Sequence, residues 1–513
     1  MFTNCLSHAT VSSHTFFILF SIAAITDSFS QYRDVPLNSS ITSVQPMTGI
    51  VLWTDNHKNK KDAISLEYSY MLYNSVVKEK GVYDWSSVDA LLEKVASRRH
   101  QAILRFRFVY PGYKTSVPDY IKSLDDYNET EGESEGETTW FPDWTHKELH
   151  GFTLEFYSEL AERYDKDPRI AFIQTGFGLW AEYHIYDGPF ILGKTFPSKE
   201  FQAAFFKHLD TVFVTTPWNI SIDAADEKYS PFKQQSDLKS ISFGLFDDSF
   251  MCEDHSEYNS RCWNFFGPKR YLYSPAGGEF SYYTDYDQKH VLDPQGIHGV
   301  SWENACKTFH ISYMIGNDQV DYQTMDRIKE AGMAAGYKFR ITRFLLSDDS
   351  ALIEVKNTGV APIYYDAYVA VGGIRARESL KLLEPDSSII CNFAINKNSL
   401  NLTIECDHLV PGQQIEYEAN LKETSTVRNT ITQKSQKFPS SGRLSLFLPD
   451  GRLVYSRNIR SLNKEIFSIL RQIHSETLAE GILFYRFESR DQYHHGRVLL
   501  TLDNLKNRLS YAY

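Results

Sequence analysis

Three features are scarce or missing in this sequence of 513 residues. Positive charge is one, because the formal net charge is −12, and this balance argues against nucleic acid or an anionic membrane surface as the main partner. Long apolar runs are another, since the run 16–25 is shorter than the ~20 residues that a membrane span needs. Cysteine is the third, with six residues and no CxxC pair. We therefore expect no metal and no cofactor.

The N-terminal residues 1–30 are predicted to be a signal peptide. The apolar run 16–25 is followed by small residues, Ser28 and Ser30, that suit cleavage before Gln31. A buried N-terminal helix is the alternative. A signal peptide predicts a soluble protein that is secreted or resides in the lumen of the secretory pathway. Four Asn-x-Ser/Thr sequons would then be candidate glycosylation sites: Asn38, Asn128, Asn219 and Asn401.

An oxidising compartment would also allow disulfides. Cys252 and Cys262 bracket a polar stretch, and Cys391 and Cys406 bracket what reads as a hairpin, so both pairs are candidates for local disulfides. Cys306 would remain free.

Between residues 47 and 330, short apolar runs alternate with amphipathic helical segments. This alternation predicts a parallel sheet with crossover helices, and eight strands in about 280 residues correspond to a (β/α)8 TIM barrel. The predicted strands are 47–53, 65–73, 101–110, 170–178, 219–224, 240–246, 270–278 and 309–316. The second of them also fits a helix by periodicity.

From residue 335 to 460 the sequence changes to short runs rich in β-branched and aromatic residues, separated by turn residues. This pattern predicts an antiparallel β-sandwich domain. Residues 461–513 are predicted to be an extension that includes an amphipathic helix at 462–481.

Two glutamates follow strands that a TIM barrel brings together. Glu182 follows the fourth predicted strand, and Glu279 follows the seventh. Side chains at the carboxyl ends of barrel strands converge on one site. A carboxyl pair of this kind suits glycoside hydrolysis, in which one group donates a proton and the other attacks the anomeric carbon. We expect Glu182, beside Trp180 and Tyr183, to be the acid/base, and Glu279, after two glycines, to be the nucleophile.

Other polar and aromatic residues at predicted strand ends are candidates for binding substrate. Arg105 and Arg107 share one face of the third strand, where one of them could hold Glu279 ionised. Structural roles, such as ion pairs, helix caps or core packing, are the alternative for each. The candidate substrate-binding residues are Trp53, Arg107, Trp180, His184, Asp223 and Asp247, the last beside Asp248.

The motifs "GLWAEYH" (178–184) and "GGEF" (277–280), with "GVYDW" (81–85) before the third strand, resemble a known clan. The chain is similar over about 47–460 to the retaining TIM-barrel glycosidases, and more narrowly to a glycosidase-like group with a β-sandwich after the barrel. In that group the fourth strand reads "GxWGEWH", so Ala181 and Tyr183 are departures here. The resemblance implies an acid/base at Glu182 and a nucleophile at Glu279.

The sequence thus predicts a secreted retaining glycoside hydrolase, or a transglycosidase, acting on an oligo- or polysaccharide. The alternative is a catalytically inactive carbohydrate-binding or scaffold protein that keeps the same fold.

Overall fold

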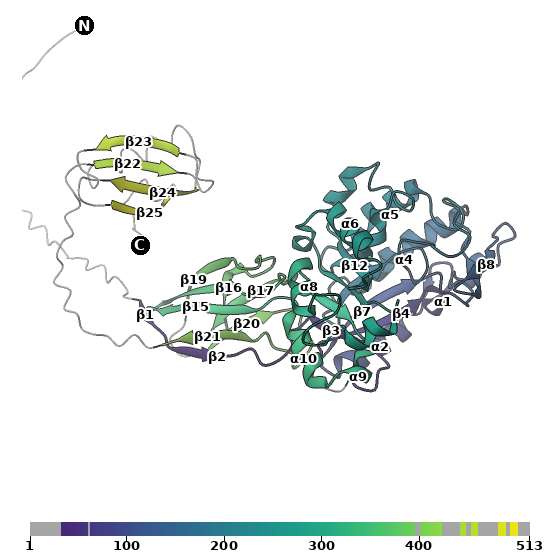
Figure 1. Ribbon diagram of the computed structural model, residues 1–513, viewed down its shortest axis with the longest axis horizontal. Coiled ribbons are helices and arrows are strands. Elements are labelled where there is room, and N and C mark those ends of the chain that lie inside the picture. The colour runs from purple at the N-terminus through teal and green to yellow at the C-terminus, as the bar shows by residue number, and fades with distance from the viewer. Residues whose placement is uncertain are drawn as a thin grey trace, which may run out of the picture. The chain divides into compact units, whose positions relative to one another are not determined.

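A computed structural model describes residues 32–59, 62–395, 401–422, 442–447, 453–459, 481–488 and 493–500 (Figure 1). The chain divides into two compact units, 1–423 and 424–513. The predicted signal peptide and residues 462–480 of the predicted helix lie outside the described residues, and Gly481 is the first residue of a strand.

The first unit contains a closed barrel of eight parallel strands, which confirms the TIM barrel. Each predicted strand overlaps one of them, but the seventh begins only at Ala276, because Arg270–Leu272 form a 3-10 turn. Their order around the barrel is the order in the chain. These strands are buried on both faces, which explains why they read as continuous apolar runs. They are β3 (Gly49–Trp53), β4 (Leu66–Leu72), β7 (Gln101–Arg107), β10 (Ile170–Thr175), β11 (Trp218–Ser221), β12 (Gly244–Phe250), β13 (Ala276–Phe280) and β14 (Tyr313–Ile315).

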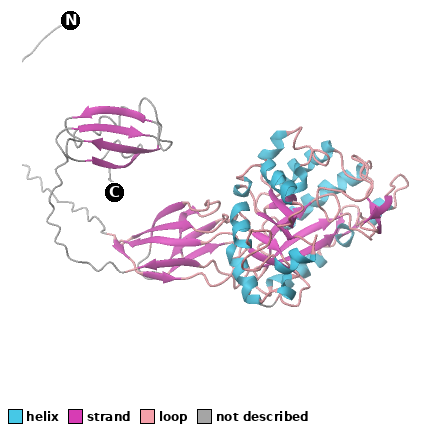
Figure 2. Ribbon diagram, viewed as in Figure 1, coloured by secondary structure: helices cyan, strands magenta, loops and turns pink. Residues whose placement is uncertain are grey.

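Helices surround the barrel strands, as Figure 2 shows. The longer helices present apolar faces to the strands, and side-chain caps begin several of them; for example, Ser198 accepts a hydrogen bond from Phe201 N. The helices are α1 (Tyr73–Val76), α2 (Ser86–Ala96), α3 (Asp119–Lys122), α4 (Lys147–Tyr164), α5 (Lys199–Val212), α6 (Ser256–Phe266), α7 (Asp285–His290), α8 (Trp302–Phe309), α9 (Gln319–Tyr322) and α10 (Met325–Ala334). None of the helices in the described ranges is long and apolar enough to cross a membrane.

Two short hairpins interrupt the alternation of strands and helices. The hairpin β5 (Val77–Glu79)–β6 (Val82–Tyr83) follows the second barrel strand, and the hairpin β8 (Thr130–Ser134)–β9 (Glu137–Phe141) follows the third. The second hairpin is inserted on the side of the barrel where strands end.

Two further sheets belong to the first unit. One has the order β19 (Ser388–Ala394), β16 (Ser350–Asn357), β15 (Phe339–Leu346), β21 (Tyr417–Leu421), β2 (Leu37–Ser39), with β1 (Arg33–Asp34) beside β15. The other is β18 (Ile374–Ser379), β17 (Ala367–Val371), β20 (Leu402–Cys406). Both contribute to one hydrophobic core. Tyr365 Oη donates to Ala171 O (2.6 Å) at the start of β10, so this core meets the barrel at the end opposite to Glu182.

The second unit contains one antiparallel sheet of order β23 (Leu453–Ile459), β22 (Gly442–Phe447), β24 (Gly481–Glu488), β25 (Tyr493–Leu500). The first two strands fall inside the predicted sandwich domain and the last two inside the predicted extension. The boundary at residue 460 therefore passes through one sheet, and the division at 423 replaces it.

Two groups of sequence-based expectations do not hold in the structure. The predicted disulfides do not form, because all five described cysteines are free and buried: Cys252, Cys262, Cys306, Cys391 and Cys406. The sequon at Asn219 is inaccessible, since this side chain is 0% exposed and donates to Pro275 O (2.7 Å).

Candidate active site

The loop after β10 carries Glu182 in a tight turn. Leu179 O accepts a hydrogen bond from Glu182 N (2.9 Å), and the two residues between them, Trp180 and Ala181, have φ angles of 54° and 58°. Positive φ at both central positions is the geometry of a type I′ turn. Gly178 lets the loop fold back on itself, because a Cβ at this position would lie 1.9 Å from His184 O.

Glu182 is buried, as the sequence predicts, but Tyr183 does not form its surroundings. Tyr183 is directed away from it and stacks on Phe206 (5.7 Å between ring centroids) in the layer between strands and helices. Burial raises the pKa of Glu182 to about 8, opposed by His184 and reinforced by Asp248 and Asp223. The carboxyl group is therefore protonated through much of the neutral range.

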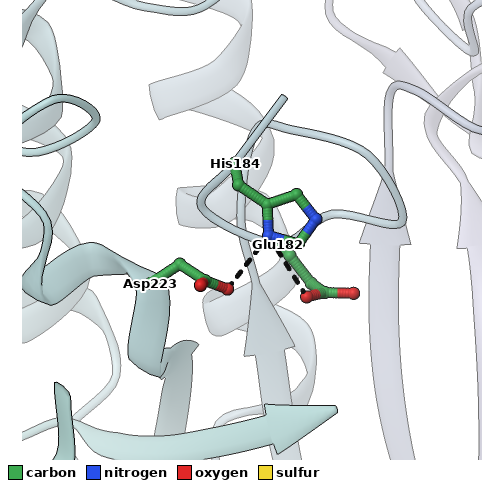
Figure 3. A group of neighbouring side chains, drawn as sticks. All are labelled: Glu182, His184 and Asp223. Carbon is green, nitrogen blue, oxygen red and sulfur yellow. Dashed lines mark hydrogen bonds and ion pairs between the residues drawn. The ribbon is translucent and has the colours of Figure 1, made fainter. Parts of the chain in front are cut away.

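His184 and Asp223 form an ion pair beside Glu182 (Figure 3). His184 Nδ1 lies 3.0 Å from Asp223 Oδ2 and 3.6 Å from Glu182 Oε2. Burial lowers the pKa of His184, but the two carboxylates more than offset it and bring that pKa to about 9. Ser221 Oγ also donates to Asp223 (2.6 Å). The structure thus brings both predicted residues to Glu182, one from the β10 loop and one from the end of β11.

By type and spacing, the same three residues could hold a metal ion, because their ligand atoms lie within 4.8 Å of one another. A metal there would have to displace the proton of His184, because ligands are deprotonated when they bind. As they stand in the structure, the three residues form a charge network in which His184 Nδ1 lies 3.0 Å from Asp223 and 3.6 Å from Glu182.

Glu279 lies on β13, and close backbone packing precedes it. A Cβ at Gly278 would lie 2.0 Å from Asp247 O, and one at Gly277 would lie 2.3 Å from the Tyr313 ring, so both positions require glycine. Burial and the Asp248 carboxylate raise the pKa of Glu279 well above its usual range, Arg105 opposes this shift, and Glu182 adds to it. Glu182 and Glu279 are thus close enough for their charges to interact.

Neither arginine of β7 forms an ion pair with Glu279 within the described residues, which corrects that expectation. Arg105 Nη1 donates to Asp248 Oδ2 (2.6 Å), and Arg105 Nε donates to Gln174 Oε1 (2.7 Å). Arg105 is 1% exposed. Arg107 lies over the Tyr110 ring, with its Cζ 4.4 Å from the ring centroid.

Asp247 does not belong to the site, which is a second correction. Its carboxylate accepts hydrogen bonds from Asn259 Nδ2 (2.9 Å) and Trp263 Nε1 (3.1 Å), both on α6 outside the barrel. Neighbouring residues of a strand point to opposite faces, so Asp248 is the one that faces Arg105 and the two glutamates.

The two predicted tryptophans lie within a chain of aromatic contacts. Trp53 contacts Tyr70 (5.7 Å), Tyr70 contacts Tyr110 (5.8 Å), and Tyr110 contacts Trp180 (6.4 Å). Trp180 in turn stacks with Tyr186 (6.1 Å), which is 58% exposed. Sequence reasoning missed the tyrosines, although Tyr68 and Tyr70 occupy alternate positions of β4 and Tyr110 follows β7 in the chain.

The chain matches no family model and no curated protein sequence. Among solved structures it is similar to the galactosidase domain of an α-galactosidase–sucrose kinase (13% identity, TM-score 0.30), over 68% of this chain and 54% of that one. It is also similar to the catalytic domain of β-amylase from Paenibacillus polymyxa (11%, TM-score 0.36, 57% of this chain and 99% of that one). A third is an endo-1,4-β-xylanase from Caldicellulosiruptor owensensis (10%, TM-score 0.34, 54% and 87%). The chain spans about half the length of the first of these, and at such scores the likeness carries no argument about activity.

Proposed function

We propose that this protein is a glycoside hydrolase that cleaves an O-glycosidic bond by double displacement, with Glu182 as acid/base and Glu279 as nucleophile. One observation carries the proposal: a buried carboxyl group, Glu182, and a half-buried one, Glu279, lie at the ends of the fourth and seventh barrel strands, and the charge of Glu182 raises the pKa of Glu279. Such a pair holds a proton near neutral pH, and a glycosidase needs one protonated and one ionised carboxyl group.

In the first step Glu182 donates its proton to the glycosidic oxygen as the bond from that oxygen to the anomeric carbon breaks. A carboxylate oxygen of Glu279 forms a bond to the same carbon, which gives a glycosyl-enzyme. Water then attacks this carbon, Glu182 takes the proton from the water, and Glu279 leaves as a carboxylate. Another sugar hydroxyl in place of water would give transglycosylation.

The network around Glu182 suits a group that must lose and regain a proton. While His184 is protonated, its positive charge 3.6 Å from Glu182 stabilises the carboxylate left after the first step. Asp223 holds the imidazole in place at 3.0 Å. His184 is therefore a positioning residue in this scheme.

We also propose a location and an architecture for the rest of the protein. The apolar run 16–25, followed by small residues, supports a secreted or lumenal protein. The two sheets of residues 33–421 outside the barrel share one hydrophobic core, which supports a β-sandwich that braces the barrel. The substrate would be an oligo- or polysaccharide.

A panel of aryl glycosides tests the proposal. Wild type should hydrolyse at least one of them, and Glu279→Ala should lose about 10⁴-fold or more because the nucleophile is absent. Azide should restore turnover of Glu279→Ala and give a glycosyl azide. Glu131→Ala removes an exposed carboxylate of the β8–β9 hairpin and serves as the matched control.

A different result would favour the inactive carbohydrate-binding protein. If wild type and Glu279→Ala turn over every substrate equally slowly, Glu182 and Glu279 are not a catalytic pair. A crystal structure with a trapped glycosyl fluoride gives a second check, because retention requires carboxyl groups about 5–5.5 Å apart.

A further inference from the structure

Among the described residues, the barrel interior contains a guanidinium, that of Arg107, that no carboxylate neutralises. Arg105 is paired with Asp248, and His184 is paired with Asp223. Within the described residues Arg107 forms no ion pair and donates no hydrogen bond, and its Nε is buried without a partner. Arg107 is half-buried, and a partly buried charge without a partner destabilises a folded protein, so this arrangement points to a missing ligand.

Arg107 lies on the same side of β7 as the groups of the candidate active site. Alternate residues of a strand share a face, so Arg107 points into the barrel as Arg105 does, one layer nearer the end where strands finish. The Tyr70 ring lies 5.6 Å from the Arg105 Cζ and 5.8 Å from the Arg107 Cζ. The charges of Glu279 and Glu182 raise the pKa of Tyr70, together with its burial. Tyr70 therefore connects Arg107 with the carboxyl pair.

The surroundings of Arg107 leave its N–H groups free. Its contacts are with tyrosine rings, the nearest that of Tyr110 at 4.4 Å, and such contacts act through the charge and the ring face. Two further buried polar atoms in this chain of rings lack a partner, Trp53 Nε1 and Tyr68 Oη. Trp53 contacts both Tyr68 (5.8 Å) and Tyr70 (5.7 Å). Hydrogen-bond donors without acceptors are thus gathered around one uncompensated cation.

We propose that the sugar bound beside Glu182 and Glu279 carries a negatively charged substituent, a carboxylate or a sulfate ester, and that Arg107 binds this group. The inference rests on the proposed glycosidase function for the identity of the ligand as a sugar. A guanidinium matches both anions with two parallel N–H donors. A neutral sugar would accept hydrogen bonds but would leave the charge of Arg107 uncompensated.

Isothermal titration of the full chain tests this inference with glucuronate, galacturonate, glucose 6-sulfate and glucose. At least one acidic sugar should bind wild type about 30-fold or more tightly than glucose, and Arg107→Met should lose that advantage. The uronates and the sulfate separate the two anions. Arg107→Lys keeps the charge but not the paired donors, and should retain an intermediate preference.

Lys239→Met is the matched control, because Lys239 also lies over an aromatic ring (3.3 Å to the Phe265 centroid) but precedes β12 at the opposite end of the barrel. It should bind acidic sugars like wild type. Arg107→Met should fold with an unchanged or higher unfolding midpoint, because it removes an unpaired, half-buried charge. If it does not fold, Arg107→Gln provides the same comparison.

Hydrolysis of aryl glucuronides and aryl glucosides by the same proteins separates this inference from the proposed function. Binding of acidic sugars that depends on Arg107, without hydrolysis of any aryl glycoside, would overturn the hydrolase and support the anion site. Hydrolysis with no preference for acidic sugars, or with a preference that Arg107→Met does not alter, would overturn the anion site and leave the hydrolase standing.

Discussion

Replacing Glu182 by glutamine should stabilise the protein at alkaline pH while removing its proposed activity. The pKa of Glu182 is about 8 in the folded chain against an ordinary value of 4.5. Each pKa unit corresponds to 1.36 kcal/mol, so ionising this buried carboxyl costs about 5 kcal/mol more than ionising it in the unfolded chain. Glutamine has nearly the same shape and never ionises.

The sign follows from where the proton is held. Below pH 4.5 both states keep the proton, so Glu182 costs no stability. Between pH 4.5 and about 8 the unfolded chain has released the proton while the folded chain retains it, and stability falls as the pH rises. Above pH 8 the cost levels off. The attraction between His184 and the Glu182 carboxylate is already included in the pKa of about 8, so we expect a gain of about 4–5 kcal/mol at pH 8.5 and under about 1 kcal/mol at pH 5.

Urea unfolding followed by tryptophan fluorescence measures this difference. All eight tryptophans lie between residues 53 and 302, so the signal reports on the barrel. Glu279→Gln should shift stability in the same direction, because burial also raises the pKa of Glu279. A gain for Glu182→Gln that is the same at pH 5 and pH 8.5, or a loss at pH 8.5, would refute the burial argument.

Two further substitutions test the support of the site. Gly178→Ala should destabilise the protein by more than about 2 kcal/mol, since its Cβ would lie 1.9 Å from His184 O. Gly151→Ala is the control: this residue is on the exposed side of α4 with no atom within 4 Å of its Cβ, and the change should stabilise the protein by about 0.5–1 kcal/mol. Equal effects of the two variants in thermal unfolding would argue against a steric role for Gly178. Asp248→Ala should lower the free energy of unfolding by about 3–5 kcal/mol, because it leaves Arg105 buried without its partner at 2.6 Å. The double variant with Arg105→Met should recover part of this loss. If urea unfolding shows no recovery, the loss of the ion pair is not what destabilises Asp248→Ala.

The barrel could be predicted from sequence because its strands are buried on both faces and therefore appear as short apolar runs between helical segments. β4 was ambiguous by periodicity, and the structure resolves it as a strand paired with β3 and β7. Glu182 and Glu279 could be predicted for the same reason, since a strand count locates the end of each strand. Which side chains pair with one another inside the barrel could not be predicted, because that depends on the direction in which each side chain points from its strand.

Asp247 and Asp248 illustrate this limit. They are adjacent and chemically identical, yet one faces α6 and the other faces Arg105. A signal for the difference does exist in the sequence: Asn259 and Trp263 are four residues apart on one face of the following helix, and both are donors that need a buried acceptor. That face predicts a partner on β12 that points outward from the barrel toward the helix, which is Asp247.

The disulfide predictions failed because spacing along the chain does not reveal which sheet a strand joins. Cys391 and Cys406 read as two sides of a hairpin, but β19 pairs with β16 in one sheet and β20 pairs with β17 in another. Burial raises the pKa of the Cys391 thiol to about 12 and that of the Cys406 thiol to about 11, so both are weakly reactive.

The buried carboxylates of this protein fall into two classes, and the difference supports a chemical role for the glutamate pair. Asp165 accepts hydrogen bonds from the backbone N–H groups of Thr215 (3.0 Å) and Thr216 (2.9 Å), and Glu67 accepts from Arg98 Nε (2.7 Å). These groups hold segments together and are satisfied as anions.

Glu182 and Glu279 accept no side-chain hydrogen bond from any described residue, although both lie in the same barrel interior. Glu182 follows two residues in the left-handed region, Trp180 and Ala181, which cost about 1–3 kcal/mol each. If Glu182 only stabilised the fold, these costs would have no benefit. Glutamine at 182 would avoid the cost of burying a carboxyl group, and glycine at 181 would avoid the backbone strain. Backbone strain directly before a buried carboxyl whose pKa is raised indicates a group kept for its chemistry, and the pH dependence of Glu182→Gln measures how much stability that chemistry costs.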